Sequence, residues 1–225
     1  MPRPDPRHTE ANQPETQQDR RSQATKRKVC RAAIACLDRH GYAETSFARV
    51  QERSGLSRGA ITHHFPTKQA LVAATAMELL SNALEPAEHR SKARTPMPVR
   101  DLILSAWDSV VNSAGGRAMV EILVACRSDR ALHDHLMAHL RDWDRISRQS
   151  ITRLYVGAGA DPDDAEVLWS ITRTFLRGLI LHEQFAGDPA YLARMVDRFA
   201  TMMESQLQPM SPPGSPADPG SGPPG

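Results

Sequence analysis

The sequence predicts an all-α protein built from two helical domains. Apolar residues recur at helical spacing through most of the 225 residues, and no stretch sustains the apolar–polar alternation of a β-strand. Proline and glycine separate these periodic stretches, most clearly at Pro86, Pro96 and Pro98, where we place a linker. The boundaries we expect are a polar, disordered tail at 1–24, a first domain at 25–84, a linker at 85–98, a second domain at 99–207 and a disordered Pro/Gly/Ser-rich tail at 208–225.

The composition is that of a soluble globular protein. Hydrophobic residues make up 40% of the chain and charged residues 24%. No apolar run reaches the length of about 18 residues that a membrane-spanning helix requires. The N-terminus, MPRPDPRHTE, lacks the apolar core of a signal peptide. We therefore expect a cytoplasmic protein with no membrane partner.

Positive charge is concentrated in the first third of the chain. From Arg20 to Lys68 there are 11 Lys and Arg against 3 Asp and Glu, whereas from Gln69 to Gln208 there are 15 against 18. This uneven distribution suits a nucleic-acid-binding unit joined to a unit with another task. Aromatic residues are few and are not interleaved with the basic ones, which argues against stacking on single-stranded bases.

The first predicted helix covers residues 25–40. An amphipathic stripe at i, i+4, i+7 and i+8 supports it, formed by Val29, Ala33, Cys36 and Leu37. We expect Gly41 to end this helix as a left-handed cap. The basic segment Arg20–Lys28 before and within its first turns fits either an arm that lies near DNA or a solvated tail.

Two short helices joined by a tight turn are predicted in the stretch SFARVQERSGLSRGAITHHFPTK. Ser46 can cap the first, because a serine oxygen accepts a hydrogen bond from an otherwise unpaired amide. Gly55 stands where the chain must turn, and only glycine takes a left-handed conformation without strain. Ser57 can cap the second helix, whose inward face is formed by Ile61 and Phe65 at i, i+4 spacing.

The second helix of this pair leaves a polar face free. Its free positions are Arg58, Gly59, Thr62 and His63, with His64 further round, and none of them is acidic. An α-helix fits the major groove of DNA, where Arg can fork onto guanine and Thr can meet a base edge or a phosphate. From this pattern alone, an exposed helix pair in some other all-α fold remains the alternative.

A wider set of features resembles one known family. They are an amphipathic helix ending in His40-Gly41-Tyr42, then Thr45-Ser46, then GLSRGAI at 55–61, HFPTK at 64–68 and Ala70-Leu71. From Thr25 to about Ala87, spacing and residue types together resemble the TetR family of bacterial transcriptional regulators. One departure is Thr62, which stands where many members carry Tyr.

This resemblance implies a function and a set of contacts. It implies a dimeric repressor that binds a palindromic, double-stranded DNA operator and is released by a small-molecule ligand held in its C-terminal domain. The candidate DNA-contacting residues are Thr45, Ser46, Ser57, Arg58, Gly59, Thr62, His63, His64 and Lys68. The alternative is a small-molecule or redox-sensing dimer that acts as an activator or binds DNA only secondarily.

The rest of the chain predicts six further helices, for about nine in all. They cover residues 67–84, 99–112, 117–127, 131–156, 161–185 and 189–207. The last two carry more apolar face than one layer can bury, and the family buries that face against a second subunit in a four-helix bundle. We therefore expect a homodimer through these two helices. Gly178 lies inside one of them, which suggests that another helix approaches it closely.

Large side chains in the second domain are candidates for an effector pocket. An apolar or aromatic effector would be lined by residues of this kind, and plain core packing is the alternative for each of them. The candidates are Trp107, Met119, Trp143, Trp169 and Phe175.

The sequence shows no catalytic or metal-binding motif. It has no nucleophile elbow, Walker loop, dinucleotide fingerprint or zinc-protease motif, so we expect no enzyme, no catalytic residue and no cofactor. A cluster of three histidines on one predicted helix fits a solvated face better than a metal site. The cysteines Cys30, Cys36 and Cys126 have no disulfide or zinc spacing; we expect small buried residues, with a redox-sensing thiol as the alternative.

Overall fold

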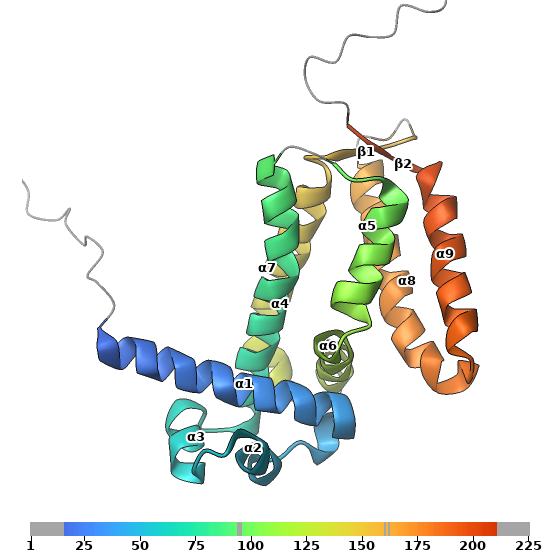
Figure 1. The fold of residues 1–225 in the computed structure, drawn as a ribbon. Helices are drawn as coiled ribbons and strands as arrows, with labels where there is room; N and C mark the ends of the chain where they lie inside the picture. The colour runs from blue at the N-terminus through green and yellow to red at the C-terminus, as the bar shows by residue number, and fades with distance from the viewer. Residues whose placement is uncertain (1–15, 94–95, 160, 162, 211–225) are drawn as a thin grey trace, which may run out of the picture.

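The computed structural model describes residues 16–93, 96–159, 161 and 163–210. This part contains nine α-helices, a π-helical turn (η1) and one pair of short strands (Figure 1). In chain order they are α1 (Gln17–Glu44), α2 (Phe47–Ser54), α3 (Arg58–His64), α4 (Lys68–Ala93), α5 (Val99–Ala106), η1 (Trp107–Val111), α6 (Ala114–Ala125), α7 (Arg130–Ile151), β1 (Tyr155–Gly157), α8 (Asp164–Ala186), α9 (Pro189–Glu204) and β2 (Leu207–Pro209). The predicted all-α class is confirmed.

The helices form a small unit at one end and a larger bundle above it. Figure 1 shows α1 lying across the lower end of the molecule, with α2 and α3 on its far side from α5, α8 and α9. Helix α4 rises from this lower unit and runs beside α7, while α5 packs on α9. Helix α6 contacts α1 from the bundle side, so the two units touch along a broad seam.

Three apolar clusters hold this arrangement together. One lies within the lower unit and is centred on Val29, Val50 and Ile61, each fully buried. A second joins the lower unit to the bundle, because Leu37 of α1 packs there with residues of α4, α6 and α7. The third lies among α5, α8, α9 and the strands. Burial of this much apolar side-chain surface is the main force that orders the helices.

Helix α1 begins earlier than the periodicity predicts. Thr16 and Asp19 form a capping box, in which each side chain accepts a hydrogen bond from the other residue's backbone amide. Residues 17–24 are therefore helical, although the sequence places them in a tail; residues 1–15 of that tail lie outside the described residues. Near its other end the helix kinks at Gly41, whose φ of 73° favours glycine. One further turn follows the kink, so Gly41 bends the helix where we expected it to end.

The predicted linker is shorter in the structure. Helix α4 continues through Pro86 to Ala93, although an interior proline removes one helical hydrogen bond. Only residues 94–98 then separate it from α5, and 94–95 lie outside the described residues.

Two predicted helix ends are strands instead. Tyr155 pairs with Pro209, Val156 with Gln208 and Gly157 with Leu207, in antiparallel register. The helices predicted from the sequence extend over residues 155–156 and 207, which is wrong there, because only the distant partner strand supplies the hydrogen bonds that favour an extended chain. The rest of the C-terminal tail, residues 211–225, lies outside the described residues.

The local turn chemistry follows the predictions. Ser46 accepts a hydrogen bond from the Arg49 amide at 3.4 Å, and Ser57 accepts one from the Ala60 amide at 3.2 Å. Gly55 has a φ of 64°, the left-handed conformation expected at the turn. Cys30, Cys36 and Cys126 are buried, and burial raises the pKa of each thiol, as expected for packing residues. No helix within the described ranges is long and apolar enough to cross a membrane.

Candidate functional site

Helix α3 presents a polar face to solvent. Ile61 is fully buried and Phe65, just after the helix, is 5% exposed, so these two anchor α3 against α1 and α2. Arg58, Gly59 and His63 are exposed on the other side. The predicted division of this helix into inward and outward residues is confirmed. Its outward face carries one guanidinium and no acidic side chain.

Thr62 and His64 lie at the edge of that face and are half-buried. The Thr62 hydroxyl lies 3.0 Å from the Arg58 carbonyl and 3.3 Å from the Gly59 carbonyl, so within the helix it donates to its own backbone. The centres of the His63 and His64 rings lie 5.1 Å apart. Burial, then the neighbouring His63 and Lys26, lower the pKa of His64, which favours the neutral imidazole.

Thr45 and Ser46 differ in their access to solvent. Ser46 is exposed, and its oxygen caps α2 while the O–H remains able to donate. Thr45 is 1% exposed, and its hydroxyl donates to the Gly41 carbonyl at 2.8 Å. The Thr45 hydroxyl is thus used to close the end of α1, and the DNA contact that the resemblance implies at Thr45 stays a prediction.

The Lys68 ammonium also has protein partners. Its Nζ donates to the Tyr42 carbonyl at 2.7 Å and to the Ala43 carbonyl at 3.1 Å, and it lies 4.2 Å from the centre of the Tyr42 ring. Burial lowers the pKa of Lys68, against the opposite effect of Asp129 and Glu44. Lys68 thus binds two backbone carbonyls at the end of α1, which leaves it one N–H for any phosphate.

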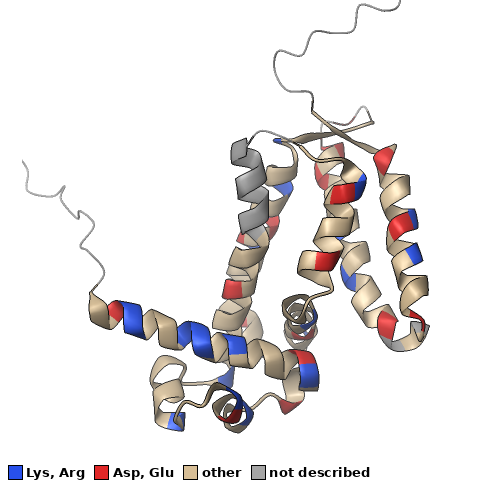
Figure 2. Ribbon diagram, in the orientation of Figure 1, with Lys and Arg blue, Asp and Glu red and all other residues tan. Residues whose placement is uncertain are grey.

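Basic residues continue along α1 beside α3. Figure 2 shows Lys and Arg recurring along α1 with few acidic residues between them, whereas α8 and α9 carry both signs. The α1 residues are Arg20, Arg21, Lys26, Arg27, Lys28, Arg31 and Arg39, all exposed except the half-buried Lys26. A polyanion that met α3 would therefore meet a basic helix as well.

Asp129 joins the lower unit to the bundle. Its Oδ1 accepts from the Leu132 amide at 3.0 Å and so caps α7. Its Oδ2 accepts from the Tyr42 hydroxyl at 2.5 Å and from Gln69 Nε2 at 2.9 Å. These bonds, the one from Tyr42 first, lower the pKa of Asp129 to about 2. The Tyr42 hydroxyl is thus bound within the protein.

An inner cavity of about 430 Å³ lies within the bundle. Its walls come from α4, α5, η1, α6, α7 and α8. Met119, Trp143 and Trp169 line it as predicted. Trp143 Nε1 also donates to the Leu80 carbonyl at 3.0 Å, which ties α7 to α4 across one wall. This volume suits a small organic ligand.

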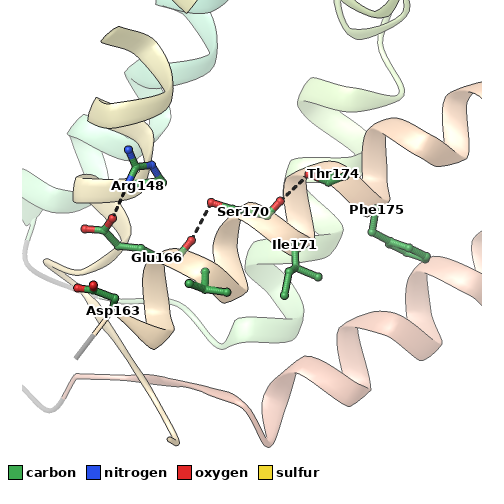
Figure 3. Close-up of a pocket in the computed structure, with 8 residues that line it drawn as sticks. Arg148, Asp163, Glu166, Ser170, Ile171, Thr174 and Phe175 are labelled. Carbon is green, nitrogen blue, oxygen red and sulfur yellow. Dashed lines mark hydrogen bonds and ion pairs between the residues drawn. The ribbon is translucent and has the colours of Figure 1, made fainter. Parts of the chain in front are cut away.

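Two predicted pocket residues lie elsewhere. Trp107 is 7% exposed and belongs to the apolar core around α5, outside the inner cavity, so its alternative as plain core is correct. Phe175 lines an open groove of about 600 Å³ on the outer side of α8 and stacks on Phe199 at 4.2 Å. Figure 3 shows this groove, with Arg148 paired to Glu166 at one end and Phe175 at the other.

Comparison with known proteins identifies the family. The family model described as "Bacterial regulatory proteins, tetR family" matches residues 29–75. Over 197 residues the chain is 30% identical to the HTH-type transcriptional regulator CymR of Pseudomonas putida, covering 85% of this chain and 91% of CymR. The chain belongs to the TetR family. It is a DNA-binding transcriptional regulator, and the predicted resemblance is confirmed.

Other relatives agree with this assignment. The HTH-type transcriptional repressor AcnR of Corynebacterium diphtheriae is 27% identical over 177 residues, covering 76% of this chain and 87% of AcnR. A TetR-family regulator from Agrobacterium tumefaciens has a solved structure that matches with a TM-score of 0.62 at 17% identity, over 80% of this chain and 98% of that one. The structural match shows that the chain has the TetR fold.

In this TetR-family chain, sequence reasoning missed the groups whose partners are distant. Arg173 and Arg177 line the inner cavity, and Asp129 joins the two units, yet none was singled out. A usable signal existed for the arginines: Trp169, Arg173 and Arg177 recur every four residues on a largely apolar helix. Asp129 offers no such signal beyond its position as a helix cap.

Proposed function

We propose that this protein is a repressor that binds a palindromic operator as a homodimer and leaves DNA when a small molecule enters the inner cavity. The observation that carries the proposal is the outward face of α3, where Arg58, Gly59 and His63 are exposed beside the basic α1. Arg is the residue best suited to read guanine in the major groove. The relative AcnR is named a repressor, in agreement with this direction of control.

The roles within the DNA-binding surface follow from exposure. Arg58, Gly59, Thr62 and His63 would read base edges or nearby phosphates. Ser46, Ser57 and His64 would position the DNA backbone, since the two serines stand at helix N-termini where backbone amides attract phosphate. Thr45 and Lys68 would act from behind, by fixing the end of α1.

The unit boundaries belong to the same proposal. Residues 25–84, extended at the N-terminal side to residue 17, would form the DNA-binding unit, and residues 99–207 the effector and dimerisation unit. Helix α4 is shared, because its first turns pack in the lower unit while Leu79, Leu80, Asn82 and Ala83 line the inner cavity. A ligand that shifts α4 would therefore move α3 relative to its partner copy.

An exposed apolar stripe on α8 supports the dimer. The residues at i, i+4, i+14 and i+18 are Val167, Ile171, Leu181 and Phe185, exposed by 53, 50, 50 and 84%. Side chains of this kind on one helical face are expected to be covered by another chain. Two-fold pairing here would present two α3 helices to two half-sites, as a palindromic operator requires.

Operator binding is the test of this proposal. The full-length protein is titrated, at several salt concentrations, onto the duplex upstream of its own coding region and onto a scrambled duplex of equal length. We expect tight binding of a dimer to the first duplex alone, with an affinity that falls as salt rises. Binding that is equally weak on both duplexes would contradict recognition of that region, and no binding to either at low salt would overturn the DNA-binding role of α3.

A further inference from the structure

The inner cavity has a one-sided charge. Among the described residues that line it, the only charged side chains are Arg173 and Arg177, both from α8. No aspartate or glutamate of the described chain contributes to the wall. The remaining wall is mostly apolar and aromatic, with Met119, Trp143 and Trp169 among its large side chains. The charged groups on the described wall of the cavity are therefore all positive.

Arg173 has hydrogen-bond donors without acceptors. Its side chain is 11% exposed, and its Nη2 donates to Asp144 Oδ1 at 2.8 Å and to Ser170 Oγ at 3.2 Å. Its Nε and Nη1 are buried and have no hydrogen-bond partner among the described residues. Buried donors in proteins are nearly always paired, and an unpaired one is costly, more so on a charged group. The missing acceptor is therefore expected from outside the chain.

The ion pairs around the cavity leave one positive charge over. Asp144 accepts from Arg173 and also from Arg148 at 3.0 Å, and Arg148 in turn pairs with Glu166 at 2.9 Å. Those two carboxylates and two guanidiniums balance. Arg177 is additional, and its guanidinium carbon lies over the Trp143 ring, 5.2 Å from the ring centre. Burial and then Arg173 lower the pKa of Arg177, against the effect of Asp144, and no ion pair joins Arg177 to a carboxylate of the described residues.

The two arginines and the two tryptophans lie close together on the cavity wall. Trp169, Arg173 and Arg177 follow one another at i, i+4 and i+8 on α8, so they share a face. Both guanidiniums lie over the Trp143 ring, Arg173 at 5.1 Å. A ligand whose anionic end met the arginines would thus place its other end among Met119 and the tryptophans. Hydrogen bonds from a guanidinium to a carboxylate are charge-assisted, so a carboxylate at this end of the cavity would be a strong acceptor for a free N–H group.

We propose that the effector is an organic monocarboxylic acid with an aromatic or other apolar body. Its carboxylate accepts from a free N–H group of Arg173 and lies beside Arg177, and its body fills the apolar part of the cavity. One surplus positive charge matches a single negative charge better than the double charge of a phosphate monoester. This inference rests on the proposed function, in which the inner cavity is the effector site.

Calorimetric titration of the full-length protein, without DNA, tests this assignment. The probes are 3-phenylpropanoate, 2-naphthoate and decanoate, each compared with its own primary amide, and 2-naphthyl phosphate. We expect at least one acid to bind about 10- to 100-fold more tightly than its amide, the range for a hydrogen bond to a charged group. We expect 2-naphthyl phosphate to bind more weakly than 2-naphthoate.

Two variants connect the preference to the arginines. Arg173→Gln and Arg177→Gln should each reduce the acid-to-amide ratio about tenfold or more, with circular dichroism and the melting transition checking that each variant folds. Arg145→Gln is the matched control, because Arg145 lies on the outer surface of α7 and pairs only loosely with Asp142 at 3.6 Å. It should leave the ratio unchanged.

The contrary outcomes are distinct. Acids that bind no more tightly than their amides, including the case in which no acid binds, would overturn the proposal. A ratio that survives both substitutions would remove the arginines from the site, and tighter binding of the phosphate would overturn the carboxylate. Since no DNA is present in these titrations, a failed operator experiment and a failed acid preference are told apart.

Discussion

The Tyr42 hydroxyl donates a 2.5 Å hydrogen bond to Asp129, across 87 residues of sequence. Tyr42 follows the kink in α1, and Asp129 caps α7, so this bond connects the N-terminal helical unit to a helix that lines the inner cavity. The Tyr42 amide also donates to Glu121 of α6 at 3.1 Å. The two units are therefore joined by hydrogen bonds from the backbone and the side chain of Tyr42 to two carboxylates of the bundle.

Tyr42→Phe should destabilise the protein by about 1–2 kcal/mol, because it removes one hydrogen bond to a charged acceptor and keeps the ring. Urea unfolding at a fixed protein concentration measures the change, since a dimer's stability depends on concentration. Tyr191→Phe is the matched control: Tyr191 is 47% exposed on α9, and its substitution should have little effect. Equal stability of Tyr42→Phe and the parent would show that the bond adds nothing to the native state.

The stabilisation that Asp129 gives to the contact between the two units should be lost in acid. Its pKa is lowered to about 2 in the folded protein, below the usual value of 3.8, chiefly by the Tyr42 hydroxyl. A folded pKa below the unfolded one means that the stabilisation is complete above about pH 4 and is lost as pH falls towards 2. The stability difference between the parent and Asp129→Asn should therefore shrink over that range. A difference that stays constant between pH 5 and pH 2.5 would contradict the ionised role, with exposed Asp142→Asn as the control.

Local signals in the sequence predicted the DNA-binding unit well. The caps at Ser46 and Ser57 and the turn at Gly55 depend on residues within four positions of each other, so their chemistry is visible in the sequence. The strand at Tyr155 and the Asp129 junction depend on partners 54 and 87 residues away, which no local pattern reveals. The charge of the cavity lies between these cases. The spacing of Trp169, Arg173 and Arg177 places them on one helical face, but only the packing of α8 shows that this face lines the cavity.

Arg58→Ala should weaken operator binding by about 1–3 kcal/mol and relax the preference at one base pair, as expected for a guanidinium that reads a base edge. Competition binding against operators changed at one position at a time measures both effects. Arg145→Ala, on the outer surface of α7, removes the same charge far from α3 and should leave operator affinity unchanged. An equal loss on random DNA would assign Arg58 to phosphate instead.

Lys68→Met should lower stability and leave the salt dependence of DNA binding unchanged. Two of the three ammonium N–H groups already donate to the Tyr42 and Ala43 carbonyls, and methionine keeps the apolar stem. Salt titrations of the variant and the parent give the two slopes directly. A slope smaller by about one would show that Lys68 neutralises a phosphate in the complex, as the family resemblance implies.

Gly178→Ala tests whether the exposed apolar face of α8 is the dimer interface, because an interface and a free surface predict different effects of the substitution. A side chain built at Gly178 meets no atom within 4 Å in the protomer, so packing within one copy gives no reason for a glycine there. Gly178 falls between Ile171 and Leu181 on the exposed apolar stripe, at the point where a partner helix would approach most closely. Alanine should then raise the dimer dissociation constant, as measured by sedimentation equilibrium. If Gly178 instead faces only water, alanine would stabilise the helix by about 1 kcal/mol and leave the dimer unchanged, which would place the interface elsewhere.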